Sequence, residues 1–129
     1  HNVTNIKASL EYFFAAQRYK QGMELAELMD VSLHAFMESP YRLKWAQWVM
    51  ARVRAGQHES DVAPYYWRAA LLYVAAACQS GNAAPETLDQ ARTLIESAEA
   101  YYENHDPLLF GRALFYHGVI ARIAHRWHA

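Results

Sequence analysis

The chain has 129 residues, of which 53% are hydrophobic and 14% aromatic, a size and composition typical of one domain with a continuous core. This apolar content excludes an intrinsically disordered chain, because burial of the side chains offsets the entropy lost on ordering. The formal net charge of −1 and the pI of 6.7 exclude the strongly basic composition of a typical nucleic-acid-binding domain. The apolar run Ala69–Cys78 is far shorter than the roughly 20 residues of a membrane-spanning helix.

Helical periodicity extends along the chain. Apolar residues recur at steps of three and four, and no stretch alternates with period two over the length of a strand. Because the connections are short, neighbouring helices are expected to be antiparallel. The sequence therefore predicts an all-α fold of about six antiparallel amphipathic helices forming three helical hairpins. Five of them are expected over residues 5–17, 19–37, 41–55, 85–104 and 107–126, and the fourth helix lies between its cap at Ser60 or Asp61 and its end at Ser80.

The first two helices are expected to meet at a tight corner made by Arg18 and Tyr19. Thr4 is a suitable N-cap for the first helix. Ser39 and Pro40 are expected to stop the second, because the residue before a proline avoids the helical conformation. The apolar positions of these two helices are Ile6, Leu10, Phe13 and Phe14 in the first, and Met23, Ala26, Met29, Leu33, Phe36 and Met37 in the second.

The third and fourth helices have clear end signals. Gly56 is a favourable residue just beyond the end of the third helix. Ser60 or Asp61 can cap the fourth, and Pro64 falls in its first turn, where a missing N–H costs little. The fourth helix is apolar nearly all round, which is typical of a buried helix. We expect Cys78 at its end to act as a buried small hydrophobe and not as a reactive thiol.

The last two helices each begin at a proline. Pro85 opens the fifth and Asp106 with Pro107 opens the sixth. Acidic residues of the fifth helix are expected to face water, with Arg92 paired to Glu96 one turn later. The predicted core stripes are Leu88, Ala91, Ile95, Ala98 and Tyr102 in the fifth helix, and Leu109, Ala113, Tyr116, Ile120, Ile123 and Trp127 in the sixth.

The segment from Tyr12 to Ala26 (YFFAAQRYKQGMELA) resembles the middle of a tetratricopeptide repeat, a helical hairpin of about 34 residues. In that repeat one helix ends in a short polar corner, an aromatic residue follows, and a small residue three positions later lets the helices approach. Tyr19 and Gly22 match these two positions. Partial matches elsewhere are Trp45 with Gly56, Gly118 with Trp127, and Gly81 with Ala91. Leu10 and Val74 depart from the pattern by standing where a small residue is usual.

The resemblance implies a degenerate tetratricopeptide-like array, similar to helical sensor regions of large bacterial transcription regulators. A compact helical bundle is the alternative. We expect residues 1–129 to form one domain cut from a longer protein. The resemblance also implies a concave groove lined by the first helix of each pair, at positions that match Lys7, Glu11, Arg54, Arg68, Arg112 and Arg122. The asparagine of the carboxylate-clamp subtype is missing, so recognition of a chaperone C-terminus is not expected.

Titratable residues do not converge on a catalytic pattern. His117, His125 and His128 share the sixth helix, but no acid follows Asp106 there, and a zinc site needs three or four ligands. The carboxylates of the fifth helix form a solvated row. The sequence has no glycine-rich phosphate loop, nucleophile elbow or Cys-x-x-Cys pair. We expect no enzymatic activity, no metal and no cofactor.

Charge is nevertheless segregated along the chain. Residues 41–57 contain four basic residues and no acid, and residues 85–106 contain six acids and one arginine. These charges either pair internally or leave a basic surface. On the third helix, Trp45 is expected in the core, whereas Trp48 and Arg52 are candidates for a contact surface, since Trp and Arg are frequent at binding hot spots. The alternative is a Trp48 that is half-buried against a neighbouring helix.

The sequence thus predicts a non-enzymatic protein–protein interaction or regulatory module of the bacterial cytoplasm. Its partner would be a protein or peptide, or a second copy of the chain, with neither a membrane nor a nucleic acid expected. The candidate binding residues are Trp48, Arg52, Arg54, Arg68, Arg112 and Arg122. One alternative is a ligand-sensing domain that holds a small molecule among Tyr65, Tyr66, Trp67 and Tyr73; a secretion-type chaperone is another.

Overall fold

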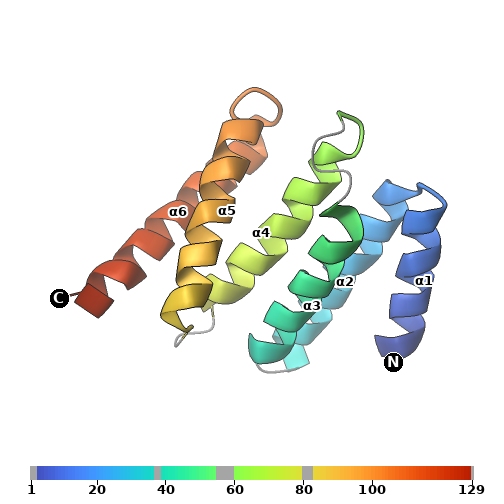
Figure 1. The fold of residues 1–129 in the computed structure, drawn as a ribbon, viewed down its shortest axis with the longest axis horizontal. Coiled ribbons are helices and arrows are strands. Elements are labelled where there is room, and N and C mark those ends of the chain that lie inside the picture. Colours follow the sequence, from blue (N-terminus) through green and yellow to red (C-terminus); the bar gives the residue numbers. More distant parts are fainter. Residues whose placement is uncertain (1–2, 37–38, 55–59, 80–82, 129) are drawn as a thin grey trace. The chain divides into compact units, whose positions relative to one another are not determined.

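The computed structural model describes residues 3–36, 39–54, 60–79 and 83–128, and over these ranges the chain forms six α-helices and no strand (Figure 1). The all-α class predicted from the sequence is therefore confirmed. In the described ranges no helix has the length and apolar content needed to cross a membrane. The helices are α1 Val3–Ala15, α2 Tyr19–Phe36, α3 Ser39–Val53, α4 Ala63–Gln79, α5 Pro85–Tyr102 and α6 Pro107–His128.

The helices belong to two compact units, residues 1–69 and residues 70–129. Unit 1 contains α1, α2, α3 and the start of α4. Unit 2 contains the rest of α4 together with α5 and α6. Each unit has its own packed helices, and the expectation of a single domain stays a prediction.

In unit 1, α1 and α2 form a hairpin around a tight corner. Gln17 adopts a left-handed φ of 61°, and the Arg18 N–H donates to the Phe13 carbonyl at 2.8 Å. The two helices approach closely at Gly22, where an added Cβ would lie 2.5 Å from the buried ring of Phe14. The small residue expected at this position is therefore required by packing. Helix α1 begins at Val3, so the prediction that Thr4 precedes it as the N-cap is wrong.

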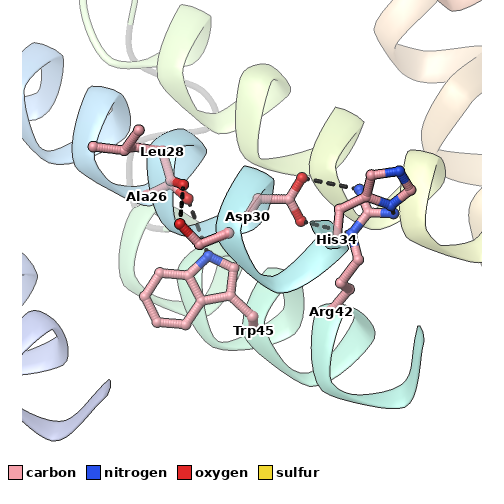
Figure 2. Close-up of polar contacts among 7 residues, drawn as sticks. Ala26, Leu28, Asp30, His34, Arg42 and Trp45 are labelled. Carbon is pink, nitrogen blue, oxygen red and sulfur yellow. Dashed lines mark hydrogen bonds and ion pairs between the residues drawn. The ribbon is translucent and has the colours of Figure 1, made fainter. Parts of the chain in front are cut away.

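Helices α2 and α3 are joined by a buried ion pair, shown in Figure 2. Arg42 Nε and Nη2 donate to Asp30 Oδ1 and Oδ2 at 3.1 and 2.9 Å. The third nitrogen, Nη1, lies 3.0 Å from His34 Nδ1, which must accept because a guanidinium has no lone pair to offer. Asp30 and His34 are four residues apart on α2, so both lie on the side of that helix that meets Arg42 of α3. The bidentate pair fixes how α2 and α3 are aligned.

Trp45 also joins α3 to α2. Its side chain is buried, as predicted, and its indole N–H donates to the Ala26 carbonyl at 3.1 Å (Figure 2). The connection before α3 differs from the prediction, because Ser39 and Pro40 open α3 instead of only stopping α2. A proline is tolerated in a first helical turn, where its N–H would lack a partner in any case. Met37 and Gly56 lie outside the described residues, as do the side chains of Phe36 and Trp127.

In unit 2, α5 and α6 pack as a hairpin. Every residue of the predicted α5 stripe is buried, namely Leu88, Ala91, Ile95, Ala98 and Tyr102. Asp106 caps α6 as expected, since its Oδ1 accepts from the Leu109 N–H at 3.1 Å. On α6, Ala113 and Ile120 are buried, whereas Leu109, Tyr116 and Ile123 are only half-buried.

Several predicted polar contacts are corrected by the structure. Arg92 pairs with Asp89, three residues before it, at 2.9 Å and not with Glu96. Glu99 does not face water freely, because its Oε2 lies against His117 Nδ1. Glu96 Oε2 lies 3.6 Å from His117 Nε2. The two carboxylates therefore approach α6 at the same imidazole, which bears a charge only when protonated.

Candidate partner-binding surface

The surface with the most distinctive chemistry lies in unit 1, where α1 and α3 contact each other. Lys7 and Glu11 stand one turn apart on α1, and Trp48 and Arg52 stand one turn apart on α3. Residues four apart share a helix face, so each helix contributes a pair that meets the other pair. We call Lys7, Glu11, Trp48 and Arg52 the Trp48 surface.

The Trp48 indole lies at the centre of this surface. Lys7 Nζ is 5.1 Å from the ring centroid and Arg52 Cζ is 4.2 Å from it. Both distances are within the range of a cation–π interaction, worth about 0.5–1 kcal/mol each at an exposed site. Behind Trp48, the buried Trp45 ring stacks against it with a centroid distance of 5.6 Å and an interplanar angle of 15°. A core tryptophan thus holds a half-buried one in place.

The ion pair across this surface is weak. Arg52 Nη2 lies 3.5 Å from Glu11 Oε2, and the two side chains are 33% and 57% exposed. Exposed pairs of this kind contribute about 0–1 kcal/mol. Among the described residues, Lys7 has no ion-pair partner at all. A carboxylate that approaches more closely than Glu11 does would therefore form a stronger ion pair with either cation.

Two of the other predicted arginines in unit 1 have different surroundings. Arg68 makes two contacts with the Glu27 carboxylate, Nε to Oε2 at 3.0 Å and Nη2 to Oε1, and lies over the Tyr65 ring. Arg68 therefore contributes to the packing of α2 against α4, with Glu27 as its partner. Arg54 is exposed just after α3. Burial raises the pKa of Tyr66, and the positive charge of Arg54 partly opposes that rise.

The remaining predicted arginines, Arg112 and Arg122, belong to unit 2. Both are exposed on α6. The structure brings Trp48 and Arg52 together and places Lys7 and Glu11 of α1 beside them. Trp48 is half-buried, as in the alternative expectation, and its role in a contact surface stays a prediction. Sequence reasoning did not connect Lys7 with Trp48, because their contact depends on the packing of α1 against α3.

A polar cleft of about 350 Å³ lies elsewhere in unit 1. Of the four aromatic residues proposed to hold a small molecule, only Tyr65 lines it, and Tyr65 stacks on Tyr19 with ring centroids 6.0 Å apart. Tyr73 belongs to unit 2, where its hydroxyl is 3.2 Å from Gln90 Oε1. The cleft is therefore not the apolar pocket that a ligand sensor would use. Its lining residues are Gln17, Arg18, Tyr19, Lys20, Gln21, Asp61, Val62 and Tyr65.

The thiol of Cys78 and the metal-ligating side chains were the remaining candidates for chemistry. Cys78 is half-buried, its thiol lies 4.0 Å from the Tyr116 carbonyl, and burial raises the thiol pKa from 9.0 to about 11. A protonated thiol is a poor nucleophile and a poor metal ligand. Within the ranges that the structure describes, no group of three or more His, Cys, Asp or Glu side chains could hold a metal ion.

Two glycines bear on the resemblance to the tetratricopeptide repeat. The close approach at Gly22 fits a tetratricopeptide-like hairpin, but a glycine serves the same purpose in other helical hairpins. Gly118, in another of the partial repeat matches, has open space where a Cβ would stand. No family model, curated protein or solved structure matches the chain. Membership of the tetratricopeptide family stays a prediction.

Proposed function

We propose that this chain is a non-catalytic protein-interaction module that binds an acidic segment of a partner protein at the Trp48 surface. The observation that carries the proposal is the half-buried indole with two cations against its ring, Lys7 at 5.1 Å and Arg52 at 4.2 Å. Trp and Arg are the residue types most often found at binding hot spots, especially where a rigid base supports them. Here the rigid base is the buried, hydrogen-bonded Trp45.

The charge of the surface favours an acidic partner. A partner carboxylate at Lys7 would gain a cation that has no ion-pair partner among the described residues. A second carboxylate could replace Glu11, whose 3.5 Å contact with Arg52 is long and exposed. Partner binding would also desolvate both cation–π contacts, which strengthens them to about 2 kcal/mol.

We also propose that the module is part of a larger regulatory protein of the bacterial cytoplasm. The partial tetratricopeptide matches favour a helical region of a larger bacterial regulator, in which such modules bind proteins or peptides. A cytoplasmic location agrees with the half-buried thiol of Cys78, the single cysteine, which needs no disulfide partner. Sequencing the parent gene tests this part, since an adjoining DNA-binding or ATPase module is expected.

Binding is tested with a labelled peptide in which several glutamates surround one phenylalanine, and with the same peptide carrying lysine for glutamate. The double variant Trp48→Ala with Arg52→Ala should bind the glutamate peptide about 30-fold more weakly, which corresponds to about 2 kcal/mol. Raised salt should slow association, because exposed charges are screened beyond roughly 8–10 Å. Fluorescence anisotropy measures the affinity, and circular dichroism checks that the variant is folded.

The matched control is Tyr12→Ala with Lys20→Ala, which removes one exposed aromatic ring and one cation away from the Trp48 surface. It should bind as the wild type does. Equal affinity of the folded Trp48 and Arg52 variant, or equal affinity of the glutamate and lysine peptides, contradicts the proposal. If the double variant unfolds, Arg52→Glu alone tests the surface, because Arg52 is exposed and its loss leaves no buried cavity.

A further inference from the structure

Helix α6 in unit 2 is apolar on two sides, but only one of them is used within the hairpin. The inner side carries the buried Ala113 and Ile120. The opposite side carries large apolar residues that are exposed to an unusual degree, Leu108 at 76%, Phe115 at 63% and Leu114 at 47%. A helix that is apolar nearly all round is typically covered on both sides. We call the exposed residues Leu108, Gly111, Arg112, Leu114, Phe115, Gly118 and Arg122 the outer face of α6.

The spacing along this face fits a single helix lying on it. Leu108 and Phe115 are seven residues apart, as are Gly111 and Gly118, which is the two-turn repeat of helices packed side by side. A Cβ added at either glycine would meet nothing within 4 Å. The glycines are therefore not required by the packing described within the chain, although each weakens α6 relative to alanine. They leave room for a second backbone to approach between the exposed apolar side chains.

The positive charge of this face favours an acidic partner. No acidic residue occurs on α6, and Arg112 and Arg122 are exposed without ion-pair partners among the residues described. A second copy is a poor occupant, because two such faces would bring four arginines together. The acidic helix of a second copy, α5, already buries its apolar stripe in its own hairpin. We infer that the outer face of α6 docks an amphipathic helix of a partner protein whose apolar stripe is flanked by glutamate or aspartate.

This surface is independent of the Trp48 surface, since its residues all belong to the other unit. The probe is a synthetic helix of about three heptads with leucine at positions a and d and glutamate at e and g. Its counterpart carries lysine at e and g. The full chain should bind the glutamate helix about tenfold more tightly than the lysine helix, because complementary charge selects between partners of equal apolar content.

Substitutions on α6 locate the contact. Gly118→Leu fills the space needed by the second backbone, at a site where the chain itself has room, and should weaken binding at least about tenfold. The matched control is Ala100→Leu, which adds the same side chain to the exposed side of α5 and should leave the affinity unchanged. Arg112→Glu with Arg122→Glu should reverse the preference between the two peptides. Anisotropy of the labelled peptides gives all these affinities.

Three results would overturn the inference. The first is that the chain binds the glutamate helix and the lysine helix with equal affinity, or binds neither. The second is an affinity of Gly118→Leu that equals the affinity of Ala100→Leu. The third comes from sedimentation of the chain alone: a dimer that Phe115→Glu dissociates would show that a second copy covers this face. A monomer that binds the glutamate helix through Gly118 and Phe115 supports the inference.

Discussion

At the scale of single residues, three arginines of unit 1 show two physical roles. Arg42 is buried and its guanidinium is matched by both oxygens of Asp30, whereas Arg52 is exposed and lies over an indole. Arg68 resembles Arg42, because it bonds Glu27 across α2 and α4. Burial makes a counterion obligatory, since an unpaired charge in the interior is strongly destabilising. Exposure leaves the charge available for a partner.

This difference leads to a prediction for the buried pair. Asp30→Asn keeps the shape of the side chain but removes the negative charge that faces the buried Arg42, and should lower the free energy of unfolding by about 3–5 kcal/mol. Asp30→Leu combined with Arg42→Met removes both charges and should be nearly neutral. Urea denaturation of the three proteins measures the difference. A double variant as unstable as Asp30→Asn would mean that the pair itself, and not the avoidance of a buried charge, stabilises α2–α3.

The Cys78 thiol gives a prediction for pH. Its folded pKa of about 11 lies above the ordinary value of 9.0 because of burial, so folding favours the protonated form. The resulting stability is fully present below pH 9.0 and is lost as the pH rises from 9.0 through about 11.

Alkylation checks the protonation of this thiol. At pH 8 the folded chain should react with iodoacetamide roughly 100-fold more slowly than after unfolding in urea, because the thiolate fraction is lower by two powers of ten. A Cys78→Ser variant should show a smaller loss of stability between pH 9.0 and about 11 than the wild type, because the contribution of the thiol is removed. Rapid alkylation of the folded protein at pH 8 would contradict the burial of Cys78.

At the scale of the helices, the glycines of α2 and α6 differ in whether the packing requires them. Gly22 lies where α1 and α2 approach so closely that a methyl group would meet the Phe14 ring at 2.5 Å. Gly118 lies where a methyl group would meet nothing within 4 Å. Gly22 is needed to pack the α1–α2 hairpin. Gly118 weakens α6, and the packing described within the chain does not require a glycine there.

Alanine substitution separates these two cases. Gly22→Ala should lower the free energy of unfolding by about 1–2 kcal/mol, because the cost of moving the buried Phe14 ring exceeds the gain in helix propensity. Gly118→Ala should raise it by about 0.5–1 kcal/mol, since only the gain remains. Both values come from urea denaturation under the same conditions. A stabilising effect of the same size at both positions would show that α1 and α2 do not approach as closely as described.

At the scale of the whole molecule, the chain is a series of antiparallel helices divided between two compact units. Far-UV circular dichroism should show a predominantly helical protein, because the described residues lie almost entirely in helices. A substantial sheet signal would be incompatible with this architecture. The two proposed binding surfaces belong to different units, the Trp48 surface to unit 1 and the outer face of α6 to unit 2.

The helices and their inner faces follow from the local sequence. The five apolar residues from Leu88 to Tyr102 recur at steps of three and four, and all five are buried as that spacing predicts. Pro64, Pro85 and Pro107 likewise locate helix starts, because a proline is tolerated only in the first turn. Such signals depend on residues within one or two turns of each other, so they can be recognised without knowing the packing.

The choice of polar partners depends on tertiary structure. Arg42 and Asp30 are 12 residues apart, and Arg52 and Glu11 are 41 apart. No local spacing identifies these pairs, because every exposed acid is an equally good candidate until the helices pack. The same holds for Lys7, which becomes part of the Trp48 surface only where α1 meets α3. Helix periodicity thus determines which side of each helix is buried, whereas packing determines which charges are neutralised and which remain free to bind.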